Sequence, residues 1–203
     1  MFVIRRFLLM VVFAAIVLGF ELQPLRRQSQ AHHQLQHVAQ EVTQIQEDKM
    51  PEAIPEFPNV SGRNIDGVPF ALPDGLSGTY NLVIMVFTQN QQQFVYDWLA
   101  ALRPLEQTTP LRVYELPTLP RFNWLQRRQL DFWMSAGISD PKSRATTITL
   151  YTDMNAMRNA LNFTDTSTLR LLLIDREGKV YWEDTGAFSE AKLKGLEAVL
   201  AAL

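Results

Sequence analysis

The chain has 203 residues, of which 47% are hydrophobic and 20% are charged, and its formal net charge is −2. This composition indicates one globular domain with additional segments, and because no long run of basic residues is present we expect no nucleic-acid partner. The sequence contains no cysteine, which excludes disulfides, thiol redox chemistry, zinc-thiolate sites and cysteine nucleophiles.

Residues 1–27 are predicted to form a membrane anchor. The stretch Phe7–Phe20 has no polar side chain, and two further leucines extend it toward the roughly 20 residues that span a bilayer. A cleaved signal peptide is the alternative, but its one candidate cleavage site, around Ser29 and Ala31, lies well beyond the apolar core and behind two arginines. We therefore expect an uncleaved, single-pass anchor.

The basic residues that flank the apolar segment give only a weak indication of the side of the membrane on which the domain lies. Arg5 and Arg6 precede the apolar segment, and Arg26 and Arg27 follow it. The excess of basic residues that marks the cytoplasmic side is therefore nearly balanced. Of the two sides, the periplasmic one is preferred over the cytoplasmic one.

Residues 28–50 are rich in glutamine and predict a helical stalk. Apolar side chains recur at spacings of three and four, as on one side of a helix. These are Ala31, Leu35, Val38, Val42 and Ile45. Two heptads are too short for a stable coiled coil alone, so the stripe either rests on its own domain or pairs weakly with a partner helix, including that of a second copy. His33 and His37 stand one turn apart but have no carboxylate or cysteine neighbour of matching geometry, so we expect solvated histidines and no metal site.

Prolines at 51, 55 and 58 predict a linker over 51–58, after which strands and helices alternate through a domain of residues 57–203. The expected strands are Val68–Leu72, Leu82–Phe87, Leu111–Leu116, Thr146–Thr152, Leu169–Ile174 and Val180–Glu183. The expected helices are Phe94–Leu102, Asn123–Ala136, Met154–Leu161 and Ser189–Leu203. The uninterrupted apolar run Leu82–Phe87 is typical of a central strand that is covered on both faces. The order of elements predicts an α/β fold, a mixed sheet flanked by helices.

Three stretches of this domain resemble a known fold. They are Phe57–Gly78, the strand, polar turn and Trp-bearing helix of Asn81–Leu102, and the hairpin Leu171–Val180. Together they are similar to the thioredoxin fold in its peroxiredoxin-like form. The resemblance covers nearly all of residues 57–203 and implies a thioredoxin-like mixed sheet.

A narrower resemblance concerns Arg144–Asp153 and Leu169–Glu190. These segments are similar to the thioredoxin-like ATP synthase assembly factors of mitochondrial inner membranes, which carry a characteristic hairpin before their last helix. The positions that match this hairpin are Asp175, Gly178, Lys179, Trp182, Gly186 and Glu190. The resemblance implies a role in the assembly of a membrane complex, with its subunits as partners.

The departures from the fold family concern its usual chemistry. Redox-active members place their cysteines at or just after the turn that here is Thr88–Gln91, and a cis-proline where this chain has Ser167. Both halves of the thiol site are missing. We therefore expect a redox-inactive protein without cofactors.

The polar turn itself is a candidate binding site. Thr88, Gln89, Asn90 and Gln91 precede a helix whose N-terminus could bind an anion or a peptide carbonyl. The alternative, which we prefer from sequence, is that these side chains cap the helix.

Catalysis without a thiol would depend on carboxylates, hydroxyls, tyrosine, lysine and arginine. The domain from Phe57 onward has no histidine and no cysteine, so a general base that works near neutral pH is lacking. Asp97 is expected to be a solvated helix carboxylate and Asp175 to be placed by turn geometry. We expect no catalytic residue.

A second candidate surface is the basic and aromatic segment Arg121–Trp133. Its candidate binding residues are Arg121, Trp124, Arg127 and Arg128. Tryptophan and arginine are common at protein interfaces and suit a membrane headgroup zone. The alternative, preferred from sequence, is that the aromatic rings are core and only the arginines are solvated.

Taken together, these features favour a membrane-anchored, redox-inactive protein that binds other proteins as an assembly factor, for a membrane complex such as ATP synthase. An alternative is a non-thiol enzyme, or a peroxiredoxin-derived oxidoreductase-like protein, that uses a cleft beside Thr88. A third is a peptide-binding domain that uses its exposed sheet edge.

Overall fold

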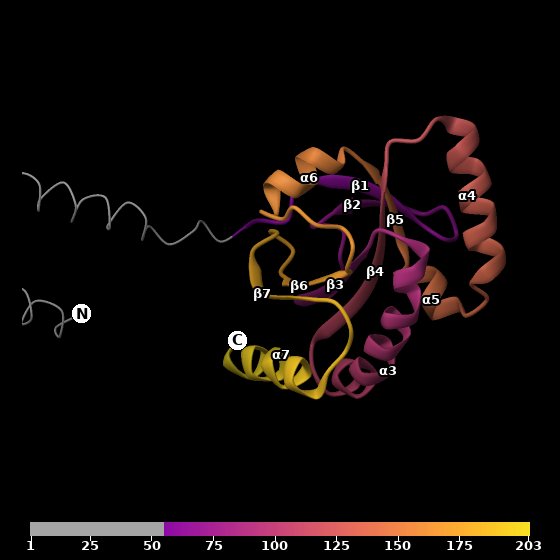
Figure 1. The fold of residues 1–203 in the computed structure, drawn as a ribbon. Helices are drawn as coiled ribbons and strands as arrows, with labels where there is room; N and C mark the ends of the chain where they lie inside the picture. Colours follow the sequence, from indigo (N-terminus) through magenta and orange to yellow (C-terminus); the bar gives the residue numbers. More distant parts are fainter. Residues whose placement is uncertain (1–54) are drawn as a thin grey trace, which may run out of the picture. The chain divides into compact units, whose positions relative to one another are not determined.

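The computed structural model describes residues 55–203 (Figure 1). The expected anchor, the stalk and the histidine pair at 33 and 37 lie outside these residues and stay predictions. Within residues 55–203, no helix is long and apolar enough to cross a membrane.

A seven-stranded mixed sheet forms the centre of the domain, in the order β2-β1-β5-β4-β3-β6-β7. The strands are β1 Val60–Asn64, β2 Pro69–Leu72, β3 Tyr80–Val86, β4 Leu111–Pro120, β5 Ile148–Thr152, β6 Arg170–Ile174 and β7 Val180–Thr185. Strands β3, β4 and β5 are parallel, whereas β1 and β2 at one end and β6 and β7 at the other pair antiparallel. The expected mixed sheet is confirmed.

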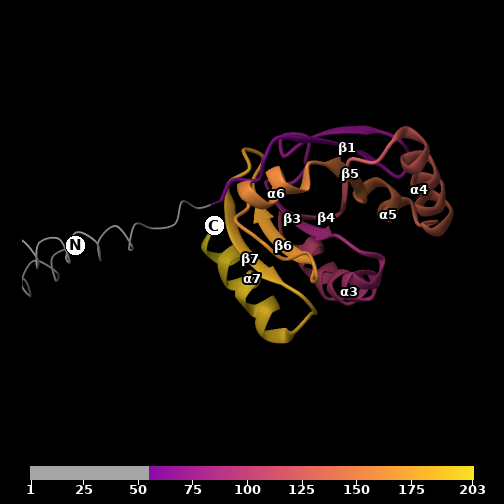
Figure 2. The ribbon, with the colours of Figure 1, turned by 45° about the horizontal axis from the view of Figure 1, so that its top comes forward.

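Helices cover both faces of this sheet, as Figure 2 shows. They are α3 Gln92–Thr108, α4 Trp124–Gly137, α5 Pro141–Thr146, α6 Met154–Ala160 and α7 Glu190–Ala202, and a short 3-10 turn, η1 Gln89–Gln91, precedes α3. Helices α3 and α7 share one hydrophobic cluster with the sheet, and α6 packs into the cluster on the opposite face.

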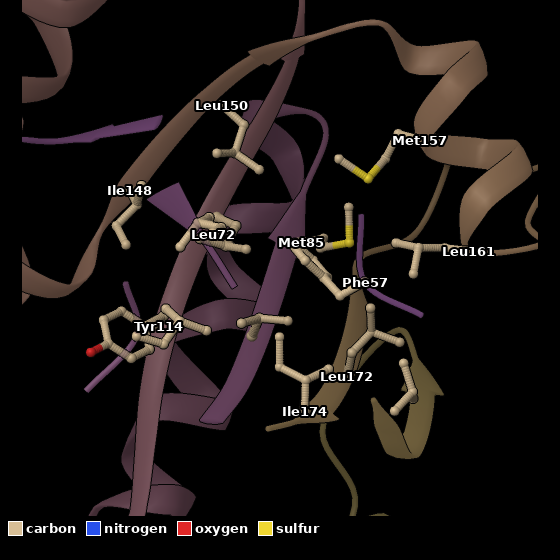
Figure 3. Close-up of a cluster of buried hydrophobic side chains, with 14 of the residues drawn as sticks. Phe57, Leu72, Met85, Tyr114, Ile148, Leu150, Met157, Leu161, Leu172 and Ile174 are labelled. Atoms are coloured by element: carbon tan, nitrogen blue, oxygen red, sulfur yellow. The ribbon is translucent and has the colours of Figure 1, made fainter. Parts of the chain in front are cut away.

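Strand β3 is the centre of both clusters, because its side chains alternate between the two faces. Leu82 and Ile84 point toward α3, whereas Val83 and Met85 point toward α6. All four are fully buried. The close-up of the α6 side shows Met85 among Leu172, Met157 and neighbouring side chains (Figure 3). The prediction of a central strand covered on both faces is confirmed.

Trp98 joins helix α3 to the rest of the domain. This side chain is fully buried. Its Nε1 donates to the carbonyl of Gly186 over 3.1 Å, and its ring meets that of Phe188 edge-on at 5.3 Å. Trp98 therefore connects α3 to the segment between β7 and α7.

Two elements were not expected from the sequence, β1 and α5. Strand β1 lacks an apolar alternation and becomes a strand by pairing with β2 and β5. A Cβ at Gly62 within it would lie 2.6 Å from Leu150, so the residue lets the backbones approach. Helix α5 does have a start signal, because Asp140 accepts from the N–H of Ser143 and Pro141 opens the helix.

Candidate functional site

The first candidate site is the turn between β3 and α3. Thr88, Gln89 and Asn90 are exposed, whereas Gln91 is only 2% exposed. The side chain of Thr88 makes no capping hydrogen bond to η1, and that of Gln91 makes none to α3. The expectation that the turn's side chains simply cap the helix is therefore wrong.

The physical reason lies in what Gln91 does instead. Its Oε1 accepts from the backbone N–H of Phe87 over 2.9 Å, and its Nε2 donates to the carbonyl of Thr166 over 2.8 Å. One carboxamide thus satisfies two backbone groups, one directly after β3 and one 75 residues beyond Gln91 in the chain. Glutamine can do this because its amide is both donor and acceptor.

The loop before β6 lies against this turn, because the carbonyl of Thr166 belongs to it. In the same loop, Ser167 donates its hydroxyl and its backbone N–H to Asp165. These hydrogen bonds lower the pKa of the Asp165 carboxyl, although the side chain is exposed. The position that the fold family gives to a cis-proline is therefore a serine within a local turn.

Aromatic side chains fill the space behind the turn. Phe87 and Phe163 are both buried, with ring centroids 5.6 Å apart. The guanidinium of Arg170 lies 4.8 Å from the Phe163 centroid. The turn therefore presents exposed polar side chains on a packed base.

Glu115 is a buried carboxyl group near this site that sequence reasoning missed. It is 7% exposed on β4. Burial raises the pKa of its carboxyl, and a hydrogen bond with Gln92, the first residue of α3, opposes that rise. The signal was present, since Glu115 is the one acidic residue of β4 and stands between Tyr114 and Leu116.

The other acidic candidates have the roles that the sequence predicts. Asp97 is exposed on α3. Asp175 accepts from the N–H groups of Glu177 and Lys179 and from the hydroxyl of Tyr181, which is a turn role. Among residues 55–203, no group of three or more His, Cys, Asp or Glu side chains could hold a metal ion.

The second candidate site is helix α4, and here the preferred prediction of an aromatic core is wrong. The helix has no buried residue. Its large apolar side chains are exposed to the following fractions: Trp124 73%, Leu125 59%, Phe132 65% and Trp133 64%. We refer to these four side chains and the exposed Arg128 as the outer face of α4.

The physical reason is the polar surface that α4 meets on the sheet. At this position β5 presents Thr149 and Tyr151, and α4 packs on them through Met134, Arg127 and Asp131. The Thr149 hydroxyl contacts the Met134 sulfur at 3.8 Å, and the Tyr151 hydroxyl donates to Asp131 over 2.7 Å. Because the polar side of the helix faces the sheet, its aromatic side faces outward.

The candidate arginines divide between these two sides. Arg127 is half-buried, its Nε donates to the carbonyl of Phe122, and its guanidinium lies 5.0 Å from the Tyr151 ring centroid. Burial, followed by the hydrogen bond to Asp131, raises the pKa of Tyr151. Arg121 and Arg128 are exposed, so they are free to meet a partner.

Both ends of α4 are closed by side chains. Asn123 accepts from the N–H of Gln126, and the side chain of Gln126 accepts from the N–H of Asn123, which is a capping box. At the other end, Arg144 donates to the carbonyls of Ser135 and Ile138. The outer face is therefore held on a well-terminated helix.

A hollow of about 640 Å³ lies beneath α4 and not beside Thr88. Its walls come from β1, β2, β5 and the inner side of α4, and include Arg63, Phe70, Met134 and Tyr151. The structure thus separates the candidate residues into two sites, the turn before α3 and the outer face of α4.

Comparison with known proteins gives matches at the level of structure only. No protein-family model and no curated protein matches the chain. Among solved structures, it is similar to BsSco, a member of the Sco family of cytochrome c oxidase assembly proteins, with 14% identity and a TM-score of 0.51, over 76% of this chain and 97% of that one. The fold is thioredoxin-like.

Other neighbours include a thiol:disulfide interchange protein from Bacteroides sp., with 15% identity and a TM-score of 0.49, over 74% of this chain and 91% of that one. The exposed lipoprotein thioredoxin of Streptococcus pneumoniae strain TIGR4 matches with 13% identity and a TM-score of 0.47, over 70% of this chain and 99% of that one. This thioredoxin-like domain contains no cysteine.

Proposed function

We propose that this chain is a membrane-anchored, redox-inactive thioredoxin-like protein that binds other proteins as an assembly factor for a membrane complex such as ATP synthase. The observation that carries the proposal is the turn before α3. It has no thiol, its one buried side chain, Gln91, is engaged with the backbone, and its other side chains are exposed. A site of this kind can make contacts but cannot exchange disulfides.

The exposed residues of the turn are suited to peptide recognition. Thr88, Gln89 and Asn90 offer hydroxyl and carboxamide groups at the start of α3, where no side chain caps the helix. Backbone N–H groups at a helix N-terminus attract carbonyl oxygens and anions. The turn therefore serves as a recognition surface for a protein partner.

The assembly role rests on the hairpin before α7, which resembles that of ATP synthase assembly factors. Some of its positions have structural duties, because Gly178 and Gly186 adopt positive φ angles of 94° and 78° and Asp175 organises the turn. BsSco is described as belonging to a family of cytochrome c oxidase assembly proteins. We accordingly propose ATP synthase as the complex that this chain helps to assemble.

The membrane location rests on the apolar segment Phe7–Phe20. In this proposal the segment crosses the membrane once as an anchor, and the thioredoxin-like domain lies on the periplasmic side. Its partners are then subunits of a membrane complex.

The test is site-specific photo-crosslinking of the full chain in its native membranes. A crosslinking amino acid at Asn90, in the turn, should give a discrete adduct with a membrane-complex subunit. The matched control is the same amino acid at Glu197, exposed on α7, which should give no such adduct. Recovery of only the free monomer from Asn90 contradicts the binding role, and an adduct with an unrelated complex contradicts the ATP synthase assignment alone.

A further inference from the structure

The outer face of α4 is a large apolar surface that the proposed partner-binding turn does not use. We propose that this face lies in the headgroup region of an anionic bilayer and forms a second membrane contact beside the anchor. The inference rests on the membrane location proposed above and adds a lipid-binding surface to it.

Helix α4 turns its apolar side chains toward the outside of the domain. Trp124, Leu125, Phe132 and Trp133 are each more than half exposed, and the rings of Phe132 and Trp133 are in edge-on contact at 5.7 Å. The opposite side of α4 is occupied by its contacts with Thr149 and Tyr151. An apolar side that faces away from the domain is the arrangement of a helix that lies in a membrane interface.

The outer face of α4 combines tryptophan with arginine. Tryptophan is enriched at the level of lipid headgroups, where its ring is in contact with both apolar and polar groups. Arg128 lies between the exposed rings on the helix surface, and Arg121 precedes the helix. Both can keep their charge among lipid phosphates while the rings insert beside them.

The segment that contains α4 is basic. Residues 121–146, which contain α4 and α5, carry five basic and two acidic side chains, in a chain whose net charge is −2. The remainder of the chain is therefore acidic. Within the basic segment, Lys142 and Arg144 form ion pairs with Glu106 and Asp66, so the exposed basic side chains at and just before α4 are Arg121 and Arg128. This distribution is complementary to an anionic lipid surface, which attracts basic residues within about a Debye length.

A long connection separates the apolar segment from the domain. The apolar segment ends at Phe20, and β1 begins at Val60. With the predicted helical stalk rising about 1.5 Å per residue and the rest extended, a connection of about 40 residues can extend over roughly 90 Å, so α4 can reach the bilayer that holds the anchor. Tethering raises the local concentration of the face at that bilayer, so even a weak interfacial affinity keeps it bound.

The absence of cysteine in the sequence permits a direct test with the full chain in liposomes. A single cysteine introduced as Gln129→Cys, on the exposed side of α4, is labelled with an environment-sensitive fluorophore. The matched control is Lys194→Cys on α7, also exposed. In vesicles that contain anionic lipid, we expect a blue shift and strong quenching by headgroup-level nitroxide lipids at position 129, and neither at position 194.

A variant with Trp124→Ser, Phe132→Ser and Trp133→Ser should lose the quenching at position 129, whereas Tyr96→Ser, which removes an exposed ring from α3, should keep it. A label that stays in water on anionic vesicles overturns the proposal. The proposal is also overturned if the label is shielded only in detergent, by a second copy of the chain, or only in native membranes, by another protein.

The anchor is tested separately in the same preparations. If alkaline carbonate releases the chain from vesicles, the proposed anchor is wrong, whereas the quenching at position 129 still reports on α4. If the chain resists carbonate and position 129 is not quenched, the anchor stands and the α4 contact is wrong.

Discussion

The turn before α3 and the outer face of α4 combine polar and apolar groups in opposite ways. At the turn, a polar side chain, Gln91, is buried and holds two backbone segments together. On α4, aromatic side chains are exposed and contribute nothing to the core. Part of the turn therefore contributes to the stability of the domain, whereas the outer face of α4 is available for binding without a structural role.

This difference separates stability from function along the chain. Substitutions behind the turn should destabilise the domain, and substitutions on the outer face of α4 should change only what the domain binds. The following predictions test that separation, with unfolding measured by urea titration of the full chain in mild detergent and followed by circular dichroism.

The largest effect is expected for Trp98→Ala in α3. The substitution removes a fully buried ring and its hydrogen bond to Gly186, which should lower the free energy of unfolding by about 3–5 kcal/mol. Tyr96→Ala on the exposed side of the same helix is the control and should change it by less than about 0.5 kcal/mol. If the two substitutions lower the free energy of unfolding equally, the buried side of α3 does not stabilise the domain more than its exposed side.

A smaller loss is expected for Gln91→Ala. The N–H of Phe87 and the carbonyl of Thr166 lose their partner, and buried groups left without a hydrogen bond should lower the free energy of unfolding by about 1–3 kcal/mol. Asn90→Ala, at the exposed neighbouring position, should be close to neutral. If Gln91→Ala is also neutral, the turn is not part of the structural framework.

Glu115→Gln should stabilise the domain in a manner that depends on pH. Because burial raises the pKa of Glu115 above 4.5, the folded state binds more protons than the unfolded state, and the stability conferred by the protonated carboxyl is lost as pH rises from 4.5 through the folded pKa. The amide cannot ionise, so the variant should gain about 1–2 kcal/mol over wild type at neutral pH. Below pH 4.5 the difference should shrink. A difference that does not change with pH would contradict the buried-acid interpretation.

The smallest effect on stability is expected on the outer face of α4. Trp133→Ser removes a side chain that is 64% exposed and should change the free energy of unfolding by no more than about 0.5 kcal/mol. The same variant should weaken the retention of the fluorescent label at lipid headgroups. A large loss of stability would show that Trp133 packs on the domain and would remove the contrast between the two regions.

The sequence allowed most of the fold to be predicted, because its strongest patterns are local. The apolar run of β3 and the spacing of Val95, Trp98 and Leu102 on α3 specify buried elements without reference to the rest of the chain. Strand β1 could not be predicted in this way, since its pairing with β2 and β5 is what makes it a strand.

The candidate sites were harder to predict because their properties depend on distant residues. The role of Gln91 requires the carbonyl of Thr166, 75 positions away. The outward orientation of the rings on α4 depends on β5 presenting Tyr151 there, whereas the spacing of the rings alone is equally compatible with a core helix. Which side of an amphipathic helix is buried is thus decided by the surface that it meets.

The capping box at Asn123 and Gln126 has a consequence for the kinetics of binding. Short helices in water are only marginally stable and many form only when they bind. Since α4 has both termini closed within the domain, its outer face is already formed before any encounter. Association should therefore follow a single step whose rate rises linearly with the concentration of the target, without the plateau that a preceding coil-to-helix transition would impose.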